Sequence, residues 1–128
     1  FQKEVAERIA EGPGSRTYGI LSVLLQTYYD IEYLFTVDED AFDPPPRVKS
    51  GVIRLLRNDL IDPGCSFLHL KRVVKGAFNQ RRKTLRNALT SAGFPEDKIP
   101  VEFLKQRAEQ LSPTEFHVLA VALIPPPS

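Results

Sequence analysis

Four cationic side chains lie within six positions of the sequence, in the run FNQRRKTLRN at residues 78–87. Guanidinium and ammonium groups at this density favour one of two roles: a solvated helix face, or a surface that contacts a polyanion such as nucleic acid. The usual partners are missing, because no acidic residue occurs between Asp62 and Glu96. That interval contains seven cations: Lys71, Arg72, Lys75, Arg81, Arg82, Lys83 and Arg86.

The formal net charge of the whole chain, +1, conceals this separation of charge. Residues 1–62 have 7 Lys/Arg against 11 Asp/Glu, a net of −4, and residues 96–128 have 3 against 5, a net of −2. Hydrophobic residues at 42% and charged residues at 26% are typical of a folded globular protein and exclude a disordered tail. The chain is therefore polarised, with a basic centre between acidic flanks.

A helix over about residues 80–92 follows from apolar residues spaced i, i+3, i+4 and i+7 that end at Gly93. With Asn79 as its N-cap, the first turn would contain residues 81–83, where the helix dipole disfavours cations by ~0.3–1 kcal/mol each. Because no acids are available for i, i+4 pairs, we expect nucleic-acid contact rather than a solvated face. The apolar positions are Leu85, Ala88, Leu89 and Ala92.

The other side chains able to do chemistry are few and isolated. Cys65 is the one cysteine, so it forms no internal disulfide and has no partner that marks it as a nucleophile. Two histidines with one cysteine give no metal-ligand spacing, and we expect His69 to pack on a helix and His117 to lie on the surface. The acidic run at residues 38–40 is interpreted as a solvated turn. This composition favours a reducing, cytoplasmic location.

The first half of the chain predicts two helices that lead into a sheet. Residues 2–11 predict a short helix, and Ser15 can cap a second helix that runs to about Tyr29. Alternating and β-rich runs over residues 31–37 and 48–56 predict two strands, joined by the loop AFDPPPRV. A two-stranded sheet is marginal alone, so we expect a fragment that oligomerises or whose other strands precede Phe1. The predicted apolar stripe of the second helix is Leu21, Leu24, Leu25 and Tyr28.

The second half is predicted to be helical from Pro63 onward, with a boundary between subdomains at residues 59–64. The last helix is the best specified: Ser112 and Glu115 form an S-x-x-E capping box, and Leu111 and Phe116 are placed as a hydrophobic staple. No apolar run approaches the roughly 20 residues of a membrane span, and no signal-peptide pattern precedes the first helix.

Four stretches of the chain together resemble the C-terminal half of the ribosomal RNA adenine dimethylase family. They are FQKEVAERI from residue 1, YGILSVLLQTYYDIEYLF from 18, AFDPPPRVKSGVIRL from 41 and AFNQRRKTLRNAL from 77, in the family's order and spacing. The resemblance is to the branch that dimethylates two adjacent adenines near the 3′ end of small-subunit rRNA.

The resemblance implies an α+β fragment, made of the last helices and two strands of a Rossmann-like methyltransferase domain followed by a small all-α domain. Residues 1–58 would be the C-terminal part of the methyltransferase domain, and residues 63–125 a small helical rRNA-binding domain. The implied cofactor is S-adenosylmethionine. The family's glycine-rich cofactor loop, ribose-binding acid and Asn-Leu-Pro-Tyr motif do not occur in this chain. We therefore expect an enzymatic parent that transfers methyl groups without a metal, and an inactive isolated chain.

The resemblance also implies a target-base contact. The family's F-x-P-P-P-x-V-x-S segment is matched within residues 42–50, and Phe42 would stack on the flipped adenine. The alternative is a plain core phenylalanine ahead of a proline turn. The matching residues are Phe42, Pro44, Pro45, Pro46, Val48 and Ser50.

The rRNA contacts implied by the resemblance are arginines and one lysine. The family's rRNA-gripping QRRK segment matches Arg81, Arg82 and Lys83, which Arg86 follows. Arg107 and Arg8 are the other implied contacts; a helix-end salt bridge for the first, and an i, i+4 pair with residue 4 for the second, are the alternatives.

The implied partners are small-subunit rRNA and a pre-30S-type ribosomal particle, with no membrane. Two rival functions stay open: a related dimethylase that acts on large-subunit rRNA and gives antibiotic resistance, and a non-enzymatic protein that binds nucleic acid or ribosomes during assembly. The triple proline and the QRRKTLRN segment favour the small-subunit branch. Residues 1–128 do not separate an enzyme from a binding protein, because the family's methyl-donor motifs lie outside them.

Overall fold

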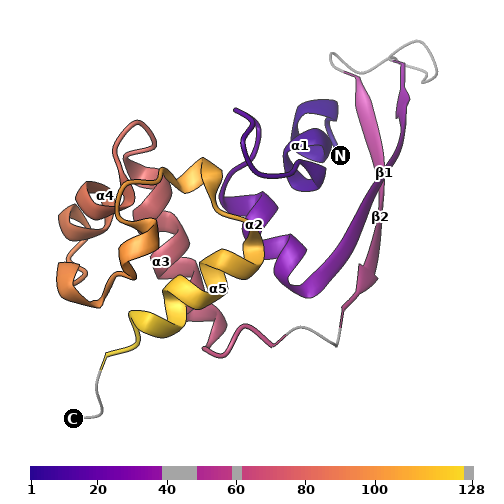
Figure 1. The fold of residues 1–128 in the computed structure, drawn as a ribbon. Coiled ribbons are helices and arrows are strands. Elements are labelled where there is room, and N and C mark those ends of the chain that lie inside the picture. Colours follow the sequence, from indigo (N-terminus) through magenta and orange to yellow (C-terminus); the bar gives the residue numbers. More distant parts are fainter. Residues whose placement is uncertain (39–48, 59–61, 126–128) are drawn as a thin grey trace.

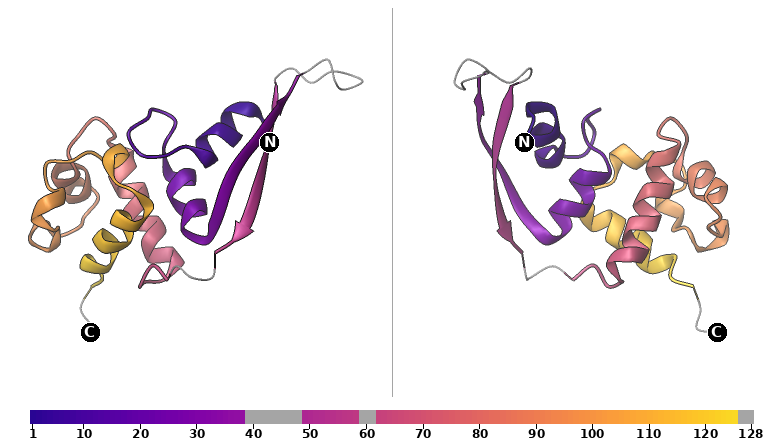
Figure 2. Two further views of the ribbon diagram at one scale, coloured as in Figure 1. Left: turned by 45° about the vertical axis from the view of Figure 1, so that its right-hand side comes forward. Right: turned by 180° about the vertical axis from the view of Figure 1, so that it is seen from behind.

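The computed structural model describes residues 1–38, 49–58 and 62–125. A two-stranded sheet stands at one end of the molecule and a cluster of helices at the other, with α1 and α2 between them (Figures 1 and 2). This mixed architecture confirms the predicted order of helices, strands and helices. In chain order the elements are α1 (Lys3–Ala10), α2 (Ile20–Tyr28), β1 (Tyr29–Val37), β2 (Ser50–Arg57), α3 (Phe67–Asn79), α4 (Leu85–Ser91), η2 (Glu96–Lys98), η3 (Val101–Phe103), η4 (Ala108–Gln110) and α5 (Pro113–Ala122).

The two strands pair antiparallel, and their paired residues run from Tyr29↔Arg57 to Val37↔Ser50. β1 begins at Tyr29, two residues before the alternating pattern that predicted it, and its register shifts after Tyr33. Helix α1 lies directly against β2. A Cβ atom at Gly51 would come within 2.6 Å of the Cβ of Ala6, so this close packing requires glycine.

Helix α2 differs from its prediction in both its start and its buried face. It begins at Ile20, because the Ser22 hydroxyl accepts a hydrogen bond from the Gly19 backbone N–H at 3.0 Å. Ser15 instead accepts from the Tyr18 N–H at 3.2 Å in the preceding loop, so its predicted capping role is wrong.

The predicted stripe of α2 is wrong for a related reason. Of its four residues only Leu24 is buried, while Leu21 is 41% exposed. The buried face contains two hydroxyls whose hydrogen bonds go to backbone carbonyls: Ser22 donates to Arg8, and Thr27 donates to Val23. Satisfied hydroxyls can be buried at little cost, and the apolar side chains are thereby turned outward.

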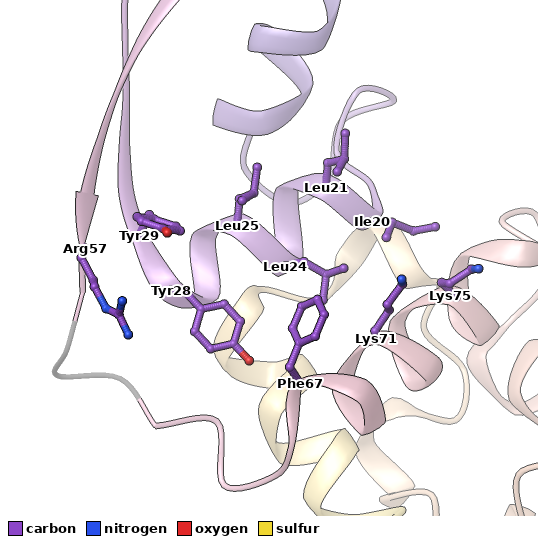
Figure 3. Close-up of a pocket in the computed structure, with 10 residues that line it drawn as sticks. All are labelled: Ile20, Leu21, Leu24, Leu25, Tyr28, Tyr29, Arg57, Phe67, Lys71 and Lys75. Atoms are coloured by element: carbon purple, nitrogen blue, oxygen red, sulfur yellow. The ribbon is translucent and has the colours of Figure 1, made fainter.

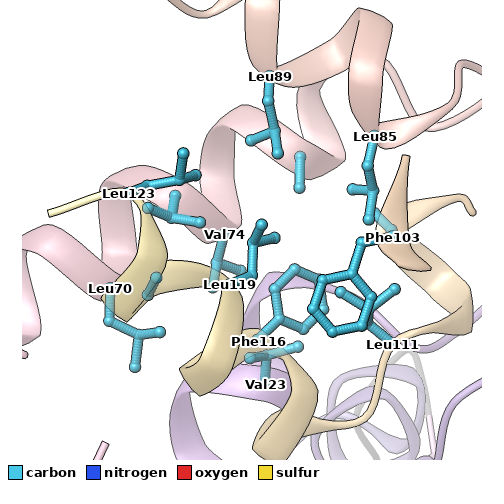
Figure 4. Close-up of a cluster of buried hydrophobic side chains, with 14 of the residues drawn as sticks. Val23, Leu70, Val74, Leu85, Leu89, Phe103, Leu111, Phe116, Leu119 and Leu123 are labelled. Atoms are coloured by element: carbon cyan, nitrogen blue, oxygen red, sulfur yellow. The ribbon is translucent and has the colours of Figure 1, made fainter. Parts of the chain in front are cut away.

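The helical cluster encloses the main core, which is shown in Figure 4. The predicted capping box of α5 is confirmed: Ser112 Oγ accepts from the Glu115 N–H, and Glu115 Oε1 accepts from the Ser112 N–H, both at 3.1 Å. Leu111 and Phe116, the predicted staple, are fully buried. The buried side chains shared among α2, α3, α4 and α5 include Val23, Leu70, Val74, Leu85, Leu89, Phe116 and Leu119.

His117 is buried, which corrects the prediction of a surface position. Its Nε2 lies 2.8 Å from Thr27 Oγ1 and thereby joins α5 to α2. Because the single hydroxyl hydrogen of Thr27 is donated to the Val23 carbonyl, the Nε2–H of His117 must be the donor to Thr27. Burial lowers the pKa of His117 below its ordinary value of 6.5, so the ring is neutral in the folded protein near pH 7.

The lowered pKa of His117 predicts loss of stability in mild acid. Below about pH 6.5 the unfolded chain binds a proton that the folded protein does not bind, so the free energy of unfolding falls until the pH passes the folded pKa. The loss is about 1.4 kcal/mol for each unit of pKa depression. We expect urea unfolding at pH 7 and pH 5 to show a smaller loss in His117→Gln than in the original protein. His69→Gln is the matched control and should keep the full loss; an equal loss in all three proteins would contradict this assignment.

Candidate nucleic-acid interface

The basic run forms a turn between α3 and α4. Helix α3 continues through Asn79, and Thr84 caps α4, with its hydroxyl 3.5 Å from the Asn87 N–H. The predicted helix over 80–92 with Asn79 as its cap is therefore wrong in its first turn. The Lys83 N–H closes the turn on the Gln80 carbonyl at 2.9 Å. The cations of residues 81–83 consequently do not face the unfavourable end of a helix dipole.

Arg81 is half-buried and its donors point into the protein. Its guanidinium donates to the backbone carbonyls of Ser15, at 3.1 Å, and Tyr18. It forms an ion pair with Glu109 at 3.4 Å and lies 5.5 Å from the centre of the Phe78 ring. The side chain therefore ties the loop before α2 to the end of α3 and to η4.

Arg86 also has an acidic partner, Glu96, which lies beside it at η2. The sequence around the basic run lacks acidic residues, but the fold brings Glu96 and Glu109, which come later in the chain, next to Arg86 and Arg81. Arg82 and Lys83 are exposed, and neither forms an ion pair within the described residues. These two side chains are the part of the run that is open to an external anion.

The other implied contacts are distributed over the surface. Arg107 is exposed at the start of η4, where its backbone N–H donates to Gln110 Oε1 at 2.7 Å and its carbonyl accepts from the Gln110 N–H at 3.0 Å. Arg8 is exposed in the last turn of α1. The i, i+4 ion pair on this helix joins Lys3 to Glu7, and the alternative pair of Arg8 with Glu4 is not formed among the described residues. Neither alternative salt bridge is formed among the residues that the structure describes. Phe42 lies outside those residues.

Sequence reasoning missed a second basic surface along α3. Lys71, Arg72 and Lys75 are exposed on this helix, one turn or less apart. All three belong to the acid-free interval of the sequence, and Lys71 and Lys75 have i, i+4 spacing. That spacing is the sequence signal for a basic helix face, and it is weaker than the signal from the four cations within residues 81–86.

The remaining polar candidates have structural partners. His69 is half-buried, as predicted, with its Nε2 2.7 Å from the Ala120 carbonyl. Burial, and then the charge of Asp62, raise the pKa of the Cys65 thiol, which is the opposite of what an activated nucleophile requires. The described segments contain no cluster of potential metal ligands. No helix among them is long and apolar enough to span a membrane.

The fold is shared with two transferases of known structure. A dimethyladenosine transferase from Plasmodium falciparum superposes with a TM-score of 0.78 at 23% identity, over 93% of this chain and 53% of that one. The 23S rRNA methyltransferase ErmE superposes with a TM-score of 0.62 at 20% identity, over 95% of this chain and 52% of that one. At these identities the likeness shows the fold.

Sequence comparison identifies the family. The family model described as ribosomal RNA adenine dimethylase matches residues 1–120, and the chain belongs to that family. Two relatives, each named ribosomal RNA small subunit methyltransferase A, are 58% identical to it. The protein from Parabacteroides distasonis aligns over 91% of this chain and 44% of its own length, and that from Porphyromonas gingivalis over 96% and 48%. The chain therefore spans about half the length of the curated relatives that it matches.

The contacts of Arg81 predict that it stabilises the fold more than its neighbours do. Arg81→Ala leaves the carbonyls of Ser15 and Tyr18 and the carboxylate of Glu109 without their donor, and we expect the free energy of unfolding to fall by about 1–3 kcal/mol. The exposed neighbour is the matched control: Arg82→Ala should stay within about 0.5 kcal/mol of the original. Urea unfolding measures both, and equal effects of the two substitutions would refute this role.

Proposed function

We propose that the protein containing this chain is an S-adenosylmethionine-dependent adenine N6,N6-dimethyltransferase of small-subunit rRNA. The observation that carries the proposal is the match of the family model over residues 1–120, together with relatives at 58% identity whose name specifies the small ribosomal subunit. This chain contributes rRNA binding and part of the target-adenine pocket. Its partners are the 16S-type rRNA and the pre-30S particle, in the cytoplasm.

We assign the proposed catalytic and rRNA-binding roles to two domains. Residues 1–58 belong to the Rossmann-like methyltransferase domain, and residues 63–125 form the small helical rRNA-binding domain. The arrangement supports this division, since both strands end by Arg57 and every regular element from Phe67 to Ala122 is helical. Helix α2 packs against the second group through Val23 and the Thr27–His117 hydrogen bond, which would hold the two domains in one orientation.

Exposed cations support the proposed grip on rRNA. Arg82 and Lys83 present exposed positive charge at the turn, and Arg107 and Arg8 add charge elsewhere on the surface. Phosphate contacts of this kind fix the position of an enzyme on RNA without reading its sequence. Arg81 serves the interface indirectly in this proposal, by holding the turn, and Arg86 keeps its charge partly neutralised by Glu96.

The chemistry at the adenine requires positioning. Bound S-adenosylmethionine would supply an electrophilic methyl group for the N6 amine of the target base. Because a stacked base cannot reach such a group, the adenine must leave its stack, and Phe42 is proposed to hold its aromatic face. The chain includes none of the family's cofactor motifs, so it is proposed to be inactive alone.

The proposed grip predicts salt-sensitive binding to small ribosomal subunits. If the turn and its neighbours neutralise three phosphates, raising salt from 50 to 200 mM should weaken binding of the chain roughly 20- to 40-fold. Arg82→Ala/Lys83→Ala should bind more weakly with a shallower salt slope, by about 0.7–0.9 for each phosphate that the variant no longer neutralises. Lys98→Ala/Lys105→Ala, which removes two exposed cations elsewhere, is the control. Identical binding by all three proteins would show that the turn is not the main contact with rRNA.

The proposed activity predicts a specific modification in the full-length protein. With S-adenosylmethionine and small subunits that lack the modification, it should form N6,N6-dimethyladenosine in small-subunit rRNA, detected by mass spectrometry of digested nucleosides. Large subunits are the control substrate. Methylation of large-subunit rRNA instead would favour the antibiotic-resistance type of dimethylase, and binding without any methylation would favour an assembly factor.

A further inference from the structure

An apolar groove of about 660 Å³ lies between α2, the base of the sheet and the start of α3 (Figure 3). Its wall on α2 is made by Leu21, Leu24 and Leu25, the apolar residues that sequence periodicity had placed inside. Tyr28 and Phe67 meet at the other wall, with ring centres 6.0 Å apart at 57°. Phe67 is 47% exposed, so an aromatic face is open to a ligand in the groove.

Cations border this groove at α3 and at the end of β2. Lys71 and Lys75 line it one helical turn apart on α3, and Arg57 lines it at the end of β2 (Figure 3). Within the described segments neither lysine forms an ion pair. Lys75 also borders a second hollow of about 290 Å³, whose lining includes Arg72 and Phe94. Each of the two hollows along α3 therefore has both a cation and an aromatic ring in its lining.

The opposite end of the groove has a neutral polar group. Burial raises the pKa of Tyr28, so its hydroxyl is protonated near neutral pH and can donate a hydrogen bond. The groove thus combines an apolar slot, an exposed aromatic ring, a neutral donor and adjacent ammonium groups. A nucleobase with its phosphate presents the complementary set: a flat apolar face, polar edges and a negative charge.

We propose that this groove binds a single-stranded segment of RNA, with one base inserted against Phe67 and Tyr28 and the flanking phosphates on Lys71 and Lys75. An acidic protein segment would satisfy the lysines but has no general use for the exposed ring, so the aromatic and cationic groups together favour RNA. The proposal rests on the rRNA-binding function proposed above and adds a second contact, on α3, to the turn at residues 82–83. A base held here would be a docking contact, separate from the target adenine.

The test is fluorescence anisotropy with the 128-residue chain and a fluorescein-labelled, mixed-sequence single-stranded RNA of ten nucleotides. Lys71→Ala/Lys75→Ala should reduce the slope of log affinity against log salt by about 1.4, because each phosphate that a lysine neutralises on a single strand adds about 0.7. Phe67→Ala should weaken binding roughly 5- to 150-fold, since the base no longer stacks on a ring. The matched controls are Lys105→Ala for charge and Leu68→Ala for an exposed apolar neighbour, and both should bind as the original does. Thermal melts establish that each variant is folded.

The outcomes separate this proposal from the function on which it rests. If the α3 and Phe67 variants bind like the original while Arg82→Ala/Lys83→Ala loses affinity, the groove proposal fails and the rRNA grip stands. If the original binds neither the oligonucleotide nor small subunits, both fail. Weaker binding by the lysine variant but not by Phe67→Ala overturns base insertion. Displacement of the RNA by an equal concentration of an acidic amphipathic peptide overturns RNA as the occupant. Crosslinking of a 4-thiouridine-substituted version of the RNA to the peptide containing Phe67 would support the proposal directly.

Discussion

The Arg81 guanidinium connects three parts of the chain that are far apart in the sequence. It reaches the carbonyls of Ser15 and Tyr18, the carboxylate of Glu109 and the ring of Phe78. Because several donors in one planar group must all be satisfied, the loop before α2, the end of α3 and η4 are held in one arrangement. The exposed turn at residues 82–83 and the packing of α2 both depend on that arrangement.

The same interaction separates the cations of one basic run into paired and exposed side chains. In the sequence the four cations of the run are equivalent, since no acid lies near them. In the fold, Arg81 and Arg86 acquire Glu109 and Glu96 as partners, whereas Arg82 and Lys83 have no acidic partner among residues 1–38, 49–58 and 62–125. An interface for a polyanion can therefore be smaller than its motif, and part of the positive charge can lie elsewhere, here on α3.

Helix α2 shows where periodicity fails and why. Its apolar residues are regularly spaced, yet the buried face includes Ser22 and Thr27, whose hydroxyls are satisfied by carbonyls of α1 and of α2 itself. A pattern that counts only apolar residues cannot recognise a hydroxyl whose partner comes from another helix. His117 was misplaced for the same reason, because its partner Thr27 is distant in sequence. The capping box of α5 was predictable since all of its groups lie within four residues.

The sequence by itself determined the order of the elements, the capping box of α5, the segregation of charge and, through four ordered motifs, membership of the ribosomal RNA adenine dimethylase family. These are properties of neighbouring residues or of their spacing along the chain. Tertiary structure alone decided which cations are neutralised, which face of α2 is buried and that an apolar groove opens beside Lys71 and Lys75. Each of these depends on residues far apart in sequence coming within a few ångströms, where burial and partner geometry set the energies.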